Sequence, residues 1–174
     1  IEGGKIDPTG LMAVGSRREN EIVAAGYIAE TGRGWLESLA IAHRAFDEAD
    51  QMLKNSPPSP LFVGSLEVLK SLSEAGLKLG ILSAATTKAV QDFVKTYQLS
   101  DYIQLEMGVD SVHLNKPDPK LFLLACERLG VEPAATLMVG DSAGDIQMGR
   151  DAGAAGCIGI CWGKPEVSHL EKAD

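Results

Sequence analysis

The chain has 174 residues, enough for one domain or for one domain with a small insertion. Its 45% hydrophobic and 23% charged residues are ordinary for a soluble globular protein. A net charge of −8 argues against a nucleic-acid or anionic-membrane partner, although a small anionic substrate could still bind at a locally positive site. No apolar run approaches the roughly 20 residues of a membrane span, and the chain does not begin like a signal peptide. The three cysteines have no metal-ligand spacing, so we interpret them as small buried hydrophobes of a cytoplasmic protein.

Residues 1–58 are predicted to form a small helical unit. Ser16 and Glu19 have the spacing of a capping box, which predicts a helix that follows Ser16 and ends near Gly32. Apolar residues at helical spacing predict a second helix from about Trp35. The proline-rich segment 56–60 fits neither a helix nor a central strand, so we place the domain boundary between residues 58 and 59.

Residues 59–174 are predicted to alternate between helices and strands. The helices are expected at 65–74, 86–97, 119–129 and 143–152, and the strands at 77–82, 103–107, 136–139 and 157–161. This alternation is typical of an α/β fold with a doubly wound, Rossmann-like parallel sheet that carries helices on both faces.

Polar side chains follow three of these strands, at the edge where open α/β sheets bind ligands. Ser83 follows the first strand, Lys116 lies in the loop after the second, and Asp141 and Asp145 follow the third. Mg²⁺ takes one or two carboxylates together with substrate phosphate. The Ser83 hydroxyl and the backbone N–H of Ala84 could bind a phosphate oxygen.

Each of these features also has a simpler structural interpretation. Asp141 or Ser142 could be a helix N-cap with Asp145 as a favourable acid in the first turn. Ser83 could be another N-cap, and Lys116 could be an exposed loop lysine. Their occurrence together at successive strand ends favours a site for Mg²⁺ and a phosphorylated ligand.

Residues 60–163 resemble the haloacid-dehalogenase-type hydrolase superfamily, in particular its capped phosphatases and phosphomutases such as phosphoglycolate phosphatase and β-phosphoglucomutase. The resemblance is carried by "LGILSAAT", "NKPDP" and, most specifically, "MVGDSAGDIQMGRDAGAAGCIGICWG". Residues before about 56 resemble the helical cap of that family only in helicity and position.

The resemblance implies a phosphatase that acts on small phosphorylated metabolites through an aspartyl-phosphate. It implies that Asp141 and Asp145 hold or orient Mg²⁺, that Ser83 and Ala84 bind the phosphoryl oxygens, and that Lys116 stabilises charge in binding and catalysis. The adjacent pair Arg17 and Arg18 in the expected cap is a weaker candidate for contact with the substrate, and a solvated helix start is an equally good interpretation of it.

One element of the resemblance is missing. The family's nucleophile lies in an Asp-x-Asp motif after an apolar strand, and the only candidate, Asp7, has no such strand before it and no second aspartate. We interpret Asp7 as an N-cap or turn residue and expect the nucleophile, with a central core strand, N-terminal to residue 1. Residues 1–174 alone would then be unstable or inactive. A phosphosugar mutase on the same scaffold and a non-enzymatic or inactive domain remain as alternatives.

Overall fold

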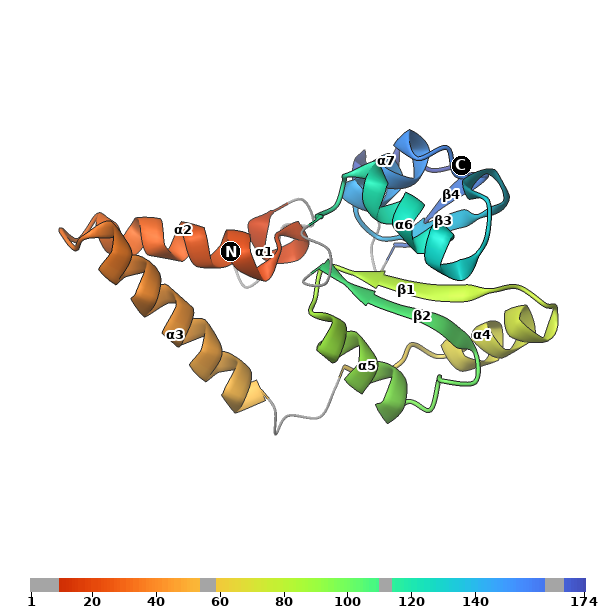
Figure 1. Cartoon of the computed structure of the whole chain (residues 1–174), viewed down its shortest axis with the longest axis horizontal. Helices are drawn as coiled ribbons and strands as arrows, with labels where there is room; N and C mark the ends of the chain where they lie inside the picture. Colours follow the sequence, from red (N-terminus) through yellow and green to blue (C-terminus); the bar gives the residue numbers. More distant parts are fainter. Residues whose placement is uncertain (1–9, 54–58, 110–113, 162–167) are drawn as a thin grey trace.

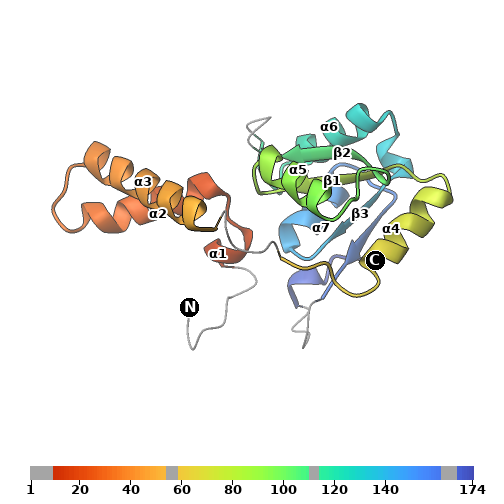
Figure 2. The ribbon, with the colours of Figure 1, turned by 90° about the horizontal axis from the view of Figure 1, so that it is seen from below.

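The computed structural model describes residues 10–53, 59–109, 114–161 and 168–174. Two parts are visible in Figures 1 and 2: a helical hairpin, and an α/β part from which the hairpin extends away. The predicted boundary between residues 58 and 59 borders an undescribed segment, 54–58, and stays a prediction. Asp7 and the motif's last two residues, Trp162 and Gly163, also lie outside the described residues.

The helical part contains α1 (Leu11–Val14), α2 (Arg17–Ala29) and α3 (Trp35–Leu53). The predicted capping box is present: the Ser16 hydroxyl accepts from the Glu19 N–H at 3.3 Å, and the Ser16 N–H donates to Glu19 Oε2 at 2.7 Å. Small buried residues, Ala25 on α2 with Ser38 and Ala42 on α3, are fully or almost fully enclosed. This narrow packing leaves the larger apolar side chains of the hairpin, such as Leu36, exposed.

The α/β part alternates between helices and strands as the sequence predicts. Its elements are α4 (Ser65–Glu74), β1 (Leu79–Ser83), α5 (Thr87–Thr96), β2 (Ile103–Gly108), α6 (Pro119–Leu129), the 3₁₀ turn Pro133–Ala135, β3 (Leu137–Gly140), α7 (Ala143–Asp151), β4 (Gly156–Gly159) and the 3₁₀ turn Ser168–Leu170. The α/β class with parallel strands is therefore confirmed. The last strand is shorter than the predicted 157–161, so Cys161 lies beyond it and is exposed, against our expectation, whereas Cys126 and Cys157 are buried as expected. No helix among these elements is long and apolar enough to cross a membrane.

The strands form two separate parallel pairs. β1 pairs with β2 and β3 pairs with β4, and within the described residues β1 and β3 have no strand on their other edges. The register aligns Ser83 with Gly108 in the first pair and Gly140 with Gly159 in the second. Within the described residues the expected single sheet is therefore divided into these two pairs, and the resemblance implies a further, central strand.

The core consists of two apolar clusters. The larger joins β2, α6, β3, α7 and β4 through buried residues such as Met107, Leu121, Met138 and Cys157. Gly149 permits the close approach of α7 to this sheet, because a Cβ there would lie 2.7 Å from Met138 Cβ and 2.8 Å from Cys157 Sγ.

The smaller cluster packs α5 against the first strand pair through Val90, Val94, Leu99 and Ile103. The β1–β2 pair contacts both α5 and α6, whereas within the described residues β3–β4 is covered by helices on one face. The side chains of Leu137, Val139 and Ile158 on that pair are 45–56% exposed. Parallel strands normally bury both faces, so this face has no cover among the residues described.

Candidate functional site

Asp145 is a buried carboxylate at the beginning of α7. Its residue is 3% exposed, and its Oδ2 accepts hydrogen bonds from the Ser142 N–H at 3.1 Å and from the Ser142 hydroxyl at 2.7 Å. The Ser142 hydroxyl in turn accepts from the Asp145 N–H at 3.2 Å, which completes a capping box. The capping interpretation of this motif is thus correct for Ser142, and it accounts for only one of the two carboxylate oxygens.

The other oxygen of Asp145 pairs with Lys116. Lys116 Nζ lies 2.6 Å from Asp145 Oδ1, and the lysine side chain is only 19% exposed. Oδ1 is buried and accepts no well-directed hydrogen bond in the described part of the chain, so its stabilisation there is mainly the charge of Lys116. Lys116 is therefore not an exposed loop lysine, because its ammonium group is directed onto the carboxylate after β3.

Gly140 provides the space in which the Asp145 side chain lies. A Cβ at Gly140 would stand 2.4 Å from Asp145 Cβ and 2.6 Å from Oδ2. Any larger residue at the end of β3 would displace the carboxylate and break its contact with Lys116. The glycine of the "VGDSAGD" motif therefore positions Asp145 sterically, a role that the sequence alone did not indicate.

Asp141 is the exposed residue between the end of β3 and the cap of α7. Asp141 lies in the sequence between Gly140, which leaves space for the Asp145 side chain, and Ser142, which donates hydrogen bonds to it. Its carboxyl group is at the carboxyl end of a parallel strand, where ligands bind in open α/β sheets.

Ser83 is the last residue of β1, and it is not the cap of the following helix. Its hydroxyl accepts from the Ala85 N–H at 3.1 Å, whereas α5 is capped by Thr86, whose hydroxyl accepts from the Ala89 N–H at 3.2 Å. Ser83 and Ala84 are half-buried in the turn between β1 and α5. The helix-cap interpretation of Ser83 is therefore wrong, and the turn keeps a hydroxyl group at the strand end.

These residues fit a Mg²⁺ ion to a limited extent. Magnesium is bound in proteins through one or two carboxylates, with water and substrate phosphate as further ligands. Asp141 and Asp145 supply two carboxylates, although the buried oxygen Asp145 Oδ1 already lies 2.6 Å from Lys116 Nζ. Within the described ranges no group of three or more His, Cys, Asp or Glu residues that could hold a metal ion is found, here or elsewhere, so a metal ion at this site would depend on the two carboxylates together with water and substrate.

The arginine pair in the helical hairpin has divided roles. Arg17 donates to Glu21 at 2.6 Å on its own helix and to Asp47 at 2.8 Å on α3, contacts Asp50 as well, and lies over the Phe46 ring at 5.1 Å. The Arg18 side chain is 65% exposed, and its one charged contact among the described residues is a 3.9 Å approach to Glu21. The guanidinium of Arg17 thus connects the two helices, while Arg18 faces solvent.

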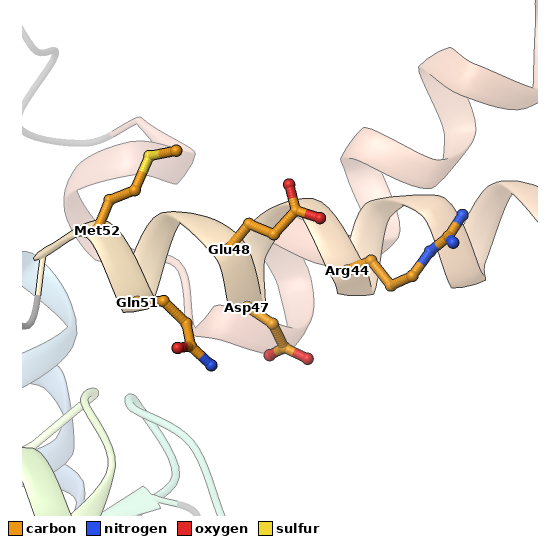
Figure 3. Close-up of a pocket in the computed structure, with 5 residues that line it drawn as sticks. All are labelled: Arg44, Asp47, Glu48, Gln51 and Met52. Carbon is orange, nitrogen blue, oxygen red and sulfur yellow. The ribbon is translucent and has the colours of Figure 1, made fainter.

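A surface hollow on the hairpin shares one residue, Asp47, with the contacts of Arg17. It is lined by Arg44, Asp47, Glu48, Gln51 and Met52, all from α3. Figure 3 shows that their side chains spread from one helix and do not converge on a point. The residues with converging polar chemistry are instead those that follow β3.

Comparison with known proteins places this arrangement in context. The probable phosphatase IndB of Dickeya dadantii is 34% identical over 125 residues, which are 72% of this chain and 54% of that protein. The phosphoglycolate phosphatase of Salmonella choleraesuis is 35% identical over 105 residues, 59% of this chain and 40% of that protein. The chain thus spans about half the length of the relatives that it matches.

The crystal structure of β-phosphoglucomutase from Clostridium difficile shares the fold with a TM-score of 0.69 at 17% identity, over 91% of this chain and 68% of that one. The family model described as haloacid dehalogenase-like hydrolase matches residues 13–153, which include Ser83, Lys116, Asp141 and Asp145. The chain therefore belongs to the haloacid dehalogenase-like hydrolases, and the curated relatives that it resembles are phosphatases.

Proposed function

We propose that the protein is a Mg²⁺-dependent phosphatase of small phosphorylated metabolites. The observation that supports this most directly is the ion pair of Lys116 with buried Asp145, next to Asp141, at the end of β3. The arrangement combines one fixed positive charge with two carboxylates, which suits a doubly charged phosphoryl group and a metal ion. The phosphatases among its relatives support the same class of reaction.

In the proposed mechanism, an aspartate carboxylate attacks the phosphorus atom and the bond from phosphorus to the substrate oxygen breaks. The leaving alcohol takes a proton from a general acid, and water then attacks the aspartyl-phosphate to release phosphate. A bound Mg²⁺ would neutralise phosphoryl charge. Asp141 would hold it, Asp145 would orient Lys116, and Ser83 with the Ala84 N–H would bind the phosphoryl oxygens.

We further propose that the attacking aspartate lies on a strand N-terminal to residue 1 that fits between β1 and β3. Two observations support this: β1 and β3 each have one edge without a partner among the described strands, and candidate site residues lie at the end of β1 and directly after β3. By this proposal residues 1–174 alone do not turn over substrate. A cytoplasmic location is proposed as well, supported by three cysteines that form no disulfide.

The test is phosphate release from an aryl phosphate by a polypeptide that extends upstream of Ile1. We expect release that requires Mg²⁺, falls to background in D141N and is unchanged in D151N, a matched control on the exposed side of α7. Release that continued in D141N would contradict the proposed role of Asp141. Turnover that required a sugar bisphosphate would indicate a phosphosugar mutase, and no turnover of any phosphate ester would favour the non-enzymatic alternative.

A further inference from the structure

Gly108 is a buried glycine at the end of β2, next to the turn that carries Ser83. It pairs with Ser83 in the parallel register of β1 and β2. It lies outside every motif that we identified in the sequence. Its position nevertheless brings the end of β2 against the residues that connect β1 to α5.

The contact leaves no space for a side chain. A Cβ on Gly108 would lie 2.2 Å from the Thr87 nitrogen, 2.4 Å from the Thr86 carbonyl carbon and 2.5 Å from the Ala85 oxygen. All three are backbone atoms, which cannot move aside by a change of rotamer as a side chain can. A residue larger than glycine would therefore displace the turn itself.

Hydrogen bonds fasten the turn to the same strand end. The Gly108 N–H donates to the Thr87 hydroxyl at 3.1 Å, and the Val109 N–H donates to the Ala85 oxygen at 3.3 Å. Within the turn, the Ala85 N–H donates to the Ser83 hydroxyl at 3.1 Å. The orientation of the Ser83 side chain is thus coupled to β2 through two residues, Ala85 and Thr87.

We propose that Gly108 is a positioning residue for the phosphoryl-binding turn: it admits the backbone of residues 85–87 and thereby sets where the Ser83 hydroxyl and the Ala84 N–H point. The inference rests on the proposed function, because it concerns the same turn. It adds that the affinity of the site for a phosphoryl group depends on a residue that does not touch the ligand. A displacement of a few tenths of an ångström is enough to weaken a hydrogen bond to phosphate.

The test compares inorganic phosphate binding to the purified protein and its variants by the amide NMR shifts of residues 83–87. For G108A we expect these signals to move before phosphate is added, and the dissociation constant to rise by about tenfold or more. G80A is the matched control on the same strand pair, because its Cβ would lie 3.2 Å from the Leu105 side chain on β2 and 3.2 Å from the Leu129 side chain on α6, and not against the turn. It should leave the turn signals and the phosphate affinity close to those of the wild type.

A second variant, T87V, removes the hydroxyl that accepts from Gly108 without adding bulk to β2. It should weaken phosphate binding by about threefold to tenfold, the scale of one lost hydrogen bond, and it answers the question if G108A does not fold. The inference would be overturned if G108A kept both the wild-type signals of the turn and the wild-type affinity for phosphate. If G108A does not fold, the same result for T87V would overturn it. If the NMR signals of the turn in the wild-type protein do not respond to phosphate, the proposed phosphate-binding function of the turn is refuted. The signals of the turn in G108A without phosphate would still show whether Gly108 determines its conformation.

Discussion

At the scale of single residues, the site depends on how one carboxylate divides its two oxygens. Asp145 Oδ2 belongs to the helix cap with Ser142, and Oδ1 faces Lys116. Removing one partner of a buried ion pair lowers the free energy of unfolding by more than the pair itself contributes, because the remaining charge is left without compensation in a medium of low polarity. The Lys116 side chain keeps some contact with water, so the penalty is smaller here than in a fully enclosed pair.

K116M should therefore lower the free energy of unfolding by about 2 kcal/mol. D145N should lower the free energy of unfolding by less in the K116M background than in the wild type, because no uncompensated charge then remains. Urea unfolding of the two single variants and the double variant measures this coupling. K120M, which changes an exposed lysine on α6, is the control and should shift stability by less than about 0.5 kcal/mol. Additive effects of K116M and D145N would mean that the ion pair does not form in solution.

At the scale of elements, the helical hairpin depends on one arginine. The Arg17 fork contacts carboxylates on both helices and lies over an aromatic ring, whereas its neighbour Arg18 does not reach α3 in any contact found among the described residues. A planar guanidinium can satisfy several acceptors at fixed angles, which an ammonium group cannot do. The two adjacent arginines therefore have different structural roles, which their positions in the sequence did not indicate.

R17K should destabilise the hairpin by about 1 kcal/mol, since it loses the fork and its contact with the ring. R18K should be neutral within about 0.5 kcal/mol. Thermal unfolding followed by helical circular dichroism measures both. If Arg18 is the residue that contacts substrate, R18A raises KM without a change in stability. Equal stability of R17K and the wild type would refute the structural role given to Arg17.

The capping box of α2 should make part of the stability of this helix depend on pH. Hydrogen bonds from the Ser16 backbone and hydroxyl lower the pKa of Glu19 below its ordinary value of 4.5. A lowered pKa in the folded state means that the contribution is complete above the unfolded value and is lost as the pH falls through the folded one. E19Q should thus cost about 0.5 kcal/mol near pH 7, and the difference from the wild type should vanish in strong acid. A difference that grew with acidity, in unfolding experiments from pH 7 to pH 2, would contradict this assignment.

At the scale of the whole molecule, the split sheet is the dominant feature. An edge strand presents alternate backbone groups that no neighbour satisfies, and the apolar residues Leu137, Val139 and Ile158 remain exposed on one face. Figure 1 shows the carboxyl ends of β1 and β2 on the side of the α/β part that faces α1. A strand placed between β1 and β3 would satisfy both edges and bring its own last residues to this side.

Hydrogen exchange should therefore be uneven along β1 and β3. In residues 1–174, amides that donate to β2 or β4 should be protected and the alternate amides should exchange rapidly. In a polypeptide that carries the additional strand, the alternate amides should become protected as well. Exchange measured by NMR separates the two cases. Uniform protection along β1 and β3 in residues 1–174 would mean that these edges already have partners.

Local patterns in the sequence determined most of the elements. The capping box at Ser16, the stop of α6 at Gly130 with a positive φ, and the alternation of strands and helices all depend on neighbouring residues and could be predicted. The same holds for Ser83 at the end of β1 and for Asp141 directly after β3, because the carboxyl ends of parallel strands follow from the order of elements.

Only the tertiary structure decided which side chains meet. That Lys116 pairs with Asp145, that Arg17 and not Arg18 joins the hairpin, and that Gly108 supports the Ser83 turn depend on distances between segments far apart in the chain. The splitting of the sheet was likewise decided there, because strand pairing is a contact between segments. Sequence periodicity indicates which face of an element is apolar. Which neighbouring element covers that face, or whether any described residue covers it, is decided only when the chain folds.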